Sequence, residues 1–153
     1  MKTARKLLGS MLFVVAPLLL AANSAQAGVS CHRIDAKGVG QDLGGGVTEA
    51  DVIGGGLLNG TTLGSFSVVG GAPPVFAVAG TVTFTARKAT LTVSLEGTFN
   101  VATGDFLTTG PVSGSTGKLS GATGSLTLDG TQDLLTGEFE EDITGVICVD
   151  LAP

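Results

Sequence analysis

The densest group of titratable side chains is the segment Glu138-Phe139-Glu140-Glu141-Asp142. Along an extended strand successive side chains point to opposite faces, so Glu141 shares a face with Phe139 and not with its acidic neighbours. Two placements are open. On a solvated outer face near a sheet rim Glu141 is an ordinary surface carboxylate. Inside an apolar interior, desolvation raises its pKa, and the group becomes an acid or base for catalysis. Glu141 is therefore the one catalytic candidate.

His32 is the only histidine and the only base around which a serine triad can form. No serine lies in a Gly-x-Ser-x-Gly nucleophile turn, and Gly114-Ser115-Thr116-Gly117 is one residue too short for it. The neighbouring Gly117-Lys118 pair is not a phosphate loop, because Leu119 stands where that loop needs Ser or Thr. We interpret His32 as a surface residue or a neighbour of a disulfide.

Two cysteines, Cys31 and Cys148, lie near opposite ends of the chain that follows the leader segment described below. Two cysteines in an exported protein usually pair, and this bond would close a loop of more than 100 residues, a stabilisation of about 4–5 kcal/mol in the chain-entropy model. There is no Cys-x-x-Cys and no second histidine for zinc. Carboxylates suit calcium, but the known calcium-loop patterns are absent. We expect no metal and no cofactor.

Residues 1–27 have the three parts of a secretory signal peptide: a basic start from Lys2, an apolar run over 7–22, and the cleavage pattern Ala25-Gln26-Ala27. The run is too short for a membrane anchor and Pro17 interrupts it. A lipoprotein signal ending at Cys31 is the alternative, but its usual leucine is missing. We predict a secreted protein, extracellular or periplasmic, without stable membrane insertion after cleavage.

Residues 28–153 then form the mature protein, which is long enough for one domain with a real core. Three of the eight basic residues lie in the signal, so five basic residues face 13 acidic ones, a net charge of −8. Nucleic acids and anionic membranes need a basic face, and neither is expected as a partner. The oligomeric state is left open by the composition.

The mature chain has the composition of a β protein. It is rich in glycine, threonine and valine, which disfavour helix. Apolar residues alternate with Thr and Ser on both sides of Arg87-Lys88, so a turn there pairs Phe84 with Leu91 and Val82 with Val93 on one face. A slip of one residue would mix the faces, and the register of this hairpin is therefore well specified.

Short strands separated by glycine-rich turns are expected in the rest of the mature chain, which indicates an antiparallel barrel or sandwich. A barrel is favoured because its first and last strands are neighbours, which brings the two cysteines together. The candidate strands besides the hairpin are 29–39, 47–58, 64–69, 75–80, 97–101, 106–112, 124–128, and a last pair at about 135–142 and 144–151.

The sequence Gly114-Ser-Thr-Gly-Lys-Leu-Ser-Gly-Ala-Thr-Gly124 resembles the G-G-[ST]-G-x-[FY]-x-G-A-x-G element of the allene oxide cyclase and dirigent barrel superfamily, especially in its secreted bacterial members. Ser113 replaces the first glycine, and Leu119 replaces the usual aromatic residue. The resemblance covers roughly residues 81–149. It implies an all-β, eight-stranded antiparallel barrel of the allene oxide cyclase-like, calycin-like type, whose lumen binds or cyclises apolar small molecules.

Characterised plant cyclases of this superfamily have a glutamate and a tyrosine among their polar lumen residues, and the mature chain has no tyrosine. No catalytic residue is therefore carried over from the resemblance. The interior of an eight-stranded barrel is either packed solid or holds one small ligand. The candidates for lining the lumen, or for plain core, are Phe66, Phe84, Leu91, Val93, Phe99, Phe106 and Phe139.

Three functions compete at this stage. The first is a secreted protein that binds an apolar small molecule in its lumen. The second is a structural or surface-adhesion module with a solid core, which the threonine-rich outer faces favour. The third is a cofactor-free isomerase or cyclase similar to allene oxide cyclase.

Overall fold

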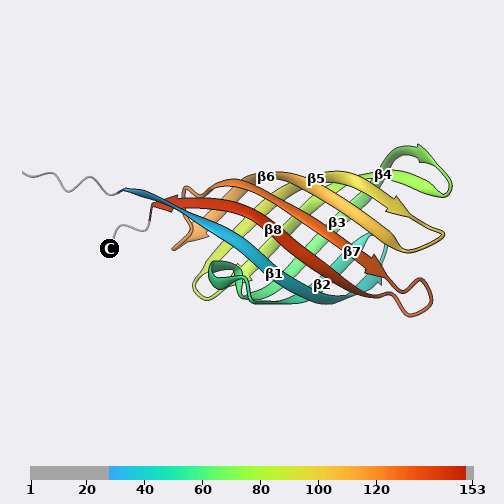
Figure 1. Cartoon of the computed structure of the whole chain (residues 1–153), viewed down its shortest axis with the longest axis horizontal. Coiled ribbons are helices and arrows are strands. Elements are labelled where there is room, and N and C mark those ends of the chain that lie inside the picture. Colours follow the sequence, from blue (N-terminus) through green and yellow to red (C-terminus); the bar gives the residue numbers. More distant parts are fainter. Residues whose placement is uncertain (1–27, 151–153) are drawn as a thin grey trace, which may run out of the picture.

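A computed structural model describes residues 28–150 of the chain, and in it eight antiparallel strands close into one barrel (Figure 1). The strands are β1 (Val29–Gly44), β2 (Val47–Ile53), β3 (Gly60–Ala72), β4 (Val75–Ala86), β5 (Ala89–Asn100), β6 (Asp105–Gly117), β7 (Thr123–Gln132) and β8 (Glu138–Asp150). Each strand pairs with its neighbours in sequence, and β1 pairs with β8 to close the barrel. The prediction of an eight-stranded antiparallel barrel is confirmed. The predicted signal peptide, residues 1–27, lies outside the described residues.

The hairpin of β4 and β5 has the predicted register, with Phe84 opposite Leu91 and Val82 opposite Val93. These four side chains are buried inside the barrel. The threonines between them face outward, where the hydroxyls of Thr83 and Thr92 lie 3.0 Å apart. Alternation of apolar and hydroxyl residues therefore fixed both the pairing and the face of these strands.

Three strands were each predicted as two separate segments, and β1, β3, β6 and β7 are also longer than predicted. Segments 75–80 and 82–86 lie in the single strand β4, and 89–95 and 97–100 lie in β5. Residues 138–150 of the predicted final pair form the single strand β8. A Cβ atom at Gly97 would lie 1.9 Å from the carbonyl oxygen of Leu107, and one at Gly145 would lie 2.2 Å from that of Ser125. These glycines permit close approach of neighbouring backbones within a coiled sheet, not a change of direction.

Strand β2 is shorter than predicted and ends at Ile53. Gly54 follows with φ of +81°, a conformation that ends the strand, and the chain continues into the short 3₁₀ turn η1 (Gly56–Leu58). Leu58, predicted to be the last residue of the strand, is completely buried and belongs to the apolar core.

The two ends of the barrel differ in packing. At the end where β1 begins and β8 ends, on the left in Figure 1, Leu58 of η1 and Leu119 and Ala122 of the β6–β7 loop complete a solid core with inward residues such as Ile147. The opposite end carries the β1–β2, β3–β4, β5–β6 and β7–β8 connections. Toward this second end the lumen contains a cavity.

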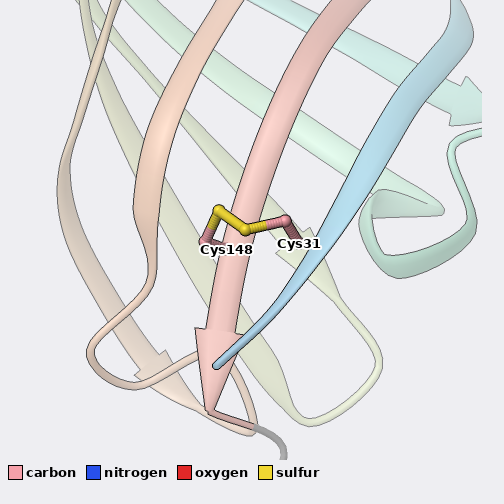
Figure 2. Close-up of a disulfide and its surroundings, with 2 residues drawn as sticks. All are labelled: Cys31 and Cys148. Carbon is pink, nitrogen blue, oxygen red and sulfur yellow. A yellow bond between two sulfur atoms is a disulfide. The ribbon is translucent and has the colours of Figure 1, made fainter. Parts of the chain in front are cut away.

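A disulfide joins Cys31 of β1 to Cys148 of β8 across the seam that closes the barrel (Figure 2). The two residues are directly opposite each other in the ladder, and the sulfur atoms are bonded at 2.06 Å. Figure 2 shows the bond spanning the two adjacent ribbons near the end of β8. The predicted pairing is confirmed, although the residues are separated by 117 positions in sequence.

Candidate functional site

The hollow half of the lumen contains a cavity of about 220 Å³. Aromatic side chains from four strands supply much of its wall: Phe66 of β3, Phe99 of β5, Phe106 of β6 and Phe139 of β8. The rings of Phe106 and Phe139 meet edge to face, with their centroids 6.0 Å apart. Val68, which is 61% exposed, also lines the cavity, so the cavity reaches solvent at this end. An apolar wall with access to solvent is typical of a small-molecule site.

Glu141 lies at the inner end of this cavity. Along β8 the inward positions are Phe139, Glu141 and Ile143, whereas Glu138, Glu140 and Asp142 are exposed. Glu141 is only 6% exposed and lines the cavity, while Ile143, the next inward residue, is completely buried in the solid core. Of the two placements open from the sequence, the structure has the one inside the lumen.

Glycines on both neighbouring strands make room for the Glu141 side chain. Glu141 pairs with Gly38 of β1 on one side and with Gly130 of β7 on the other. A Cβ atom at Gly38 would lie 2.7 Å from Cγ of Glu141, and one at Gly130 would lie 2.9 Å from its Cβ. Any larger residue at either position would therefore press on this carboxyl side chain.

Burial raises the pKa of Glu141 from 4.5 to about 7, because the charged form loses its hydration in the lumen. Within residues 28–150 no hydrogen bond or ion pair reaches its carboxyl group to offset that loss. Near neutral pH the group is thus present in both forms. A carboxyl group with a pKa near the working pH can donate a proton or a hydrogen bond, and it can also accept a proton.

Thr108 of β6 supplies a second polar group without a partner. The residue is 3% exposed and lines the cavity, and its hydroxyl has no hydrogen-bond partner among the described residues. Most buried hydroxyls in proteins are hydrogen-bonded, so an orphan of this kind calls for an explanation such as a ligand or an ordered water. Sequence reasoning missed Thr108. The signal was a threonine at an inward position, two residues after Phe106.

At the open end of the cavity, hydrogen bonds from other residues fix the side chain of Asp42. Its carboxylate accepts hydrogen bonds from the backbone N–H of Gly44 at 2.7 Å and from Nε2 of Gln132 at 3.0 Å. The backbone N–H of Asp42 also donates to the carbonyl of Gly137. These contacts join the end of β1 to the end of β7 and to the β7–β8 loop, so they hold the wall of the cavity mouth together at this point.

The predicted lumen residues divide between the two halves of the barrel. Phe66, Phe99, Phe106 and Phe139 line the cavity. The other three, Phe84, Leu91 and Val93, also point inward but are completely buried in the solid core and do not line it. For these three the alternative of plain core describes the structure.

The other residues singled out from the sequence lie away from the cavity. His32 is half-buried, directly follows the disulfide-bonded Cys31 and pairs with Ile147 near the closed end, so the interpretation as a neighbour of a disulfide fits. Its Nε2 is buried and has no hydrogen-bond partner among residues 28–150. Lys118 is an exposed residue of the β6–β7 loop. No cluster of three or more His, Cys, Asp or Glu side chains able to hold a metal ion occurs in the part of the chain that the structure describes.

A larger but shallow hollow of about 950 Å³ lies beside β1, β2 and β3 and is rimmed by the exposed carboxylates Glu49, Asp51, Glu138 and Glu140. These groups face solvent, and none of them is enclosed by apolar residues as Glu141 is. The cavity in the lumen is therefore the candidate functional site.

No protein-family model, curated protein or solved structure matches this chain. Among the described residues there is no helix with the length and apolar character needed to cross a membrane.

Proposed function

We propose that this protein is an exported barrel of the allene oxide cyclase-like type that binds a small apolar molecule in its lumen. The observation that carries the proposal is the cavity of about 220 Å³ with four phenylalanines in its wall, together with the Thr108 hydroxyl and the Glu141 carboxyl group, neither of which has a hydrogen-bond partner among the described residues. A structural module needs no such hollow. The closed eight-stranded barrel and the position of the Gly114–Gly124 element at the β6–β7 turn support the family assignment.

The size of the cavity sets the size of the ligand. Engineered apolar cavities of about 150 Å³ hold benzene. A cavity of about 220 Å³ that also opens to solvent therefore accommodates a substituted benzene ring or an aliphatic molecule of similar bulk. Long acyl chains would extend through the mouth beyond Val68.

A second function, a cofactor-free isomerase or cyclase, is favoured by one observation, the pKa of about 7 for Glu141 within the cavity. A general acid or base works best with a pKa near the pH of the reaction. If Glu141→Gln abolishes turnover of a candidate substrate but still binds it, the result would favour an enzyme over a protein that only binds its ligand.

The test of the binding function combines two measurements. Native mass spectrometry of protein purified from its own host is expected to show a co-purifying apolar molecule. Propylbenzene is expected to raise the melting temperature of the wild type. The shift should be lost in Val78→Phe, which fills the cavity from an inward position of β4, and kept in Thr81→Phe, an outward position of the same strand. An empty protein with no shift would contradict the proposal.

A further inference from the structure

The cavity contains hydrogen-bonding capacity that the protein does not use. The Thr108 hydroxyl is buried without a partner, and the carboxyl group of Glu141 has none among the described residues. The two residues occupy adjoining rows of the barrel wall, since Thr108 pairs with Leu128 and Glu141 with Gly130, two positions further along β7. An unpaired polar group in an apolar site is unfavourable, so a ligand that pairs with it gains affinity and specificity.

The charges around Glu141 decide which ligands can pair with it. Gly38 and Gly130 flank it on β1 and β7, and the lining residues of β2 to β6 are not ionisable. Asp42 of β1 is the other ionisable residue of the lining, and its carboxylate already accepts hydrogen bonds from Gly44 and Gln132. Among residues 28–150, no lysine, arginine or histidine lines the cavity. An anionic ligand would thus enter an apolar site without a counter-charge, beside two carboxyl groups, which is unfavourable.

Protonated Glu141 and Thr108 both offer O–H donors, and a neutral oxygen acceptor satisfies either of them. Resting on the proposed function, we infer that the cavity selects a neutral molecule about the size of a substituted benzene ring that carries an acceptor oxygen, such as an aryl ketone, with Glu141 as its principal hydrogen-bond donor. Hydrocarbons of the same size fit the cavity but leave the donors unpaired. Carboxylates of the same size are excluded by charge.

Four probes with the same number of non-hydrogen atoms separate the ligand classes: acetophenone (neutral acceptor), propylbenzene (no acceptor), benzoate (anion) and phenethylammonium (cation). Dissociation constants are measured by NMR titration of the full mature protein at about pH 5.5 and about pH 8.5. The ratio of the propylbenzene constant to the acetophenone constant reports the acceptor preference. Comparing this ratio between variants cancels the difference in hydrophobicity of the two probes.

In the wild type the acceptor preference is expected to fall from the lower to the higher pH, because Glu141 loses its donor proton. The fall should be up to about tenfold, which corresponds to the net free energy of one hydrogen bond. Glu141→Gln keeps a donor that does not titrate, so its preference should stay high at both pH values. Glu141→Leu has no donor, so its preference should be low at both. Glu140→Gln, on the outer face of the same strand, is the matched control and should behave like the wild type.

Several results would overturn the inference. A wild-type ratio that does not change with pH, or tighter binding of benzoate or phenethylammonium than of acetophenone, would leave a binding cavity but assign it another ligand class. If propylbenzene and the other three probes all fail to bind, the proposed function itself fails. The wild-type pH comparison and the Gln variant decide the question even if Glu141→Leu does not fold.

Discussion

Glu141 is the residue at which burial and charge oppose each other most directly. Burial raises its pKa from 4.5 to about 7, so the folded protein holds this proton more tightly than the unfolded chain does. The contribution of the group to the free energy of unfolding is therefore largest below about pH 4.5. It falls as the pH rises toward 7 and is constant above that, a total loss on the order of 3 kcal/mol.

This gives a prediction for Glu141→Gln, whose amide does not titrate. Chemical denaturation of both proteins is measured from about pH 4 to about pH 8. Across that range the free energy of unfolding of the variant, relative to that of the wild type, should increase by roughly 3 kcal/mol. Asp105, whose pKa is lowered by hydrogen bonds from Thr103 and Thr131, is present in both proteins and cancels in the difference. Glu140→Gln should give a flat difference. A flat difference for Glu141→Gln would mean that its carboxyl group is hydrated in solution.

The inward position of Glu141 followed from the sequence as far as alternation goes, since it shares a face with Phe139. Whether that face met solvent at a rim or the lumen did not follow. That depended on the pairing of Glu141 with Gly38 and Gly130, residues more than 100 positions and 11 positions away, whose missing side chains leave space for a carboxyl group. Local patterns cannot report a space created by such pairings.

At the scale of elements, the sequence predicted the pairing of the β4 and β5 strands better than it predicted the lengths of the strands. The β4–β5 register was specified by a long run of alternating residues. The predicted breaks at 81, 96 and 143 lie close to the glycines Gly80, Gly97 and Gly145, none of which ends a strand. At Gly97 and Gly145 the missing side chain permits close approach of two strands in mid-sheet. Which role a glycine has depends on the neighbouring strand.

The β6–β7 turn tests these two roles of glycine side by side. Gly121 has φ of +76°, and a Cβ atom there would have no neighbour within 4 Å. Gly124 has φ of +132°, and its Cβ atom would lie 2.1 Å from the carbonyl oxygen of Val146 on β8. Gly121→Ala should thus lower the free energy of unfolding by about 1 kcal/mol, from backbone strain alone. Gly124→Ala should cost about 3 kcal/mol or more, because β7 must move away from β8.

Thermal and urea denaturation of the two variants would measure this order. Lys118→Gln, at an exposed position of the same loop, is the control and should stay within about 0.5 kcal/mol of the wild type. Equal losses for the two glycines would show that conformational strain, and not contact with Val146, determines the role of Gly124.

At the scale of the whole molecule, the barrel is solid at one end and hollow at the other. Composition left open whether the lumen was packed or empty, and the answer differs between the two halves. The solid half is completed by Leu58 and Leu119, which come from a turn and a loop and not from the strands. No such plug from the described residues closes the half that contains Glu141. The division depends on the inward packing of connections, for which alternation within strands gives no signal.

The barrel is closed by the pairing of β1 with β8, and the Cys31–Cys148 disulfide links the same two strands. The ladder there runs from Val29 paired with Asp150 to Gln41 paired with Glu138, so backbone hydrogen bonds hold the seam even without the disulfide. In the chain-entropy model, a cross-link between residues 117 positions apart still contributes about 4–5 kcal/mol, by restricting the unfolded chain. Reduction is therefore expected to leave a folded barrel of lower stability.

Dithiothreitol should reach this bond, because Cys31 is exposed on the outer face of the barrel. We expect the reduced wild type and the double variant Cys31→Ser/Cys148→Ser to keep the same β-type circular dichroism spectrum as the oxidised protein. Both should unfold at a denaturant concentration lower by an amount corresponding to about 4 kcal/mol. Reductant should have no effect on the double variant, which controls for other actions of the reagent. If reduction leaves the unfolding midpoint unchanged, either residual structure already restricts the unfolded chain or the bond is not formed in solution. A thiol assay of the denatured, unreduced protein separates these two outcomes.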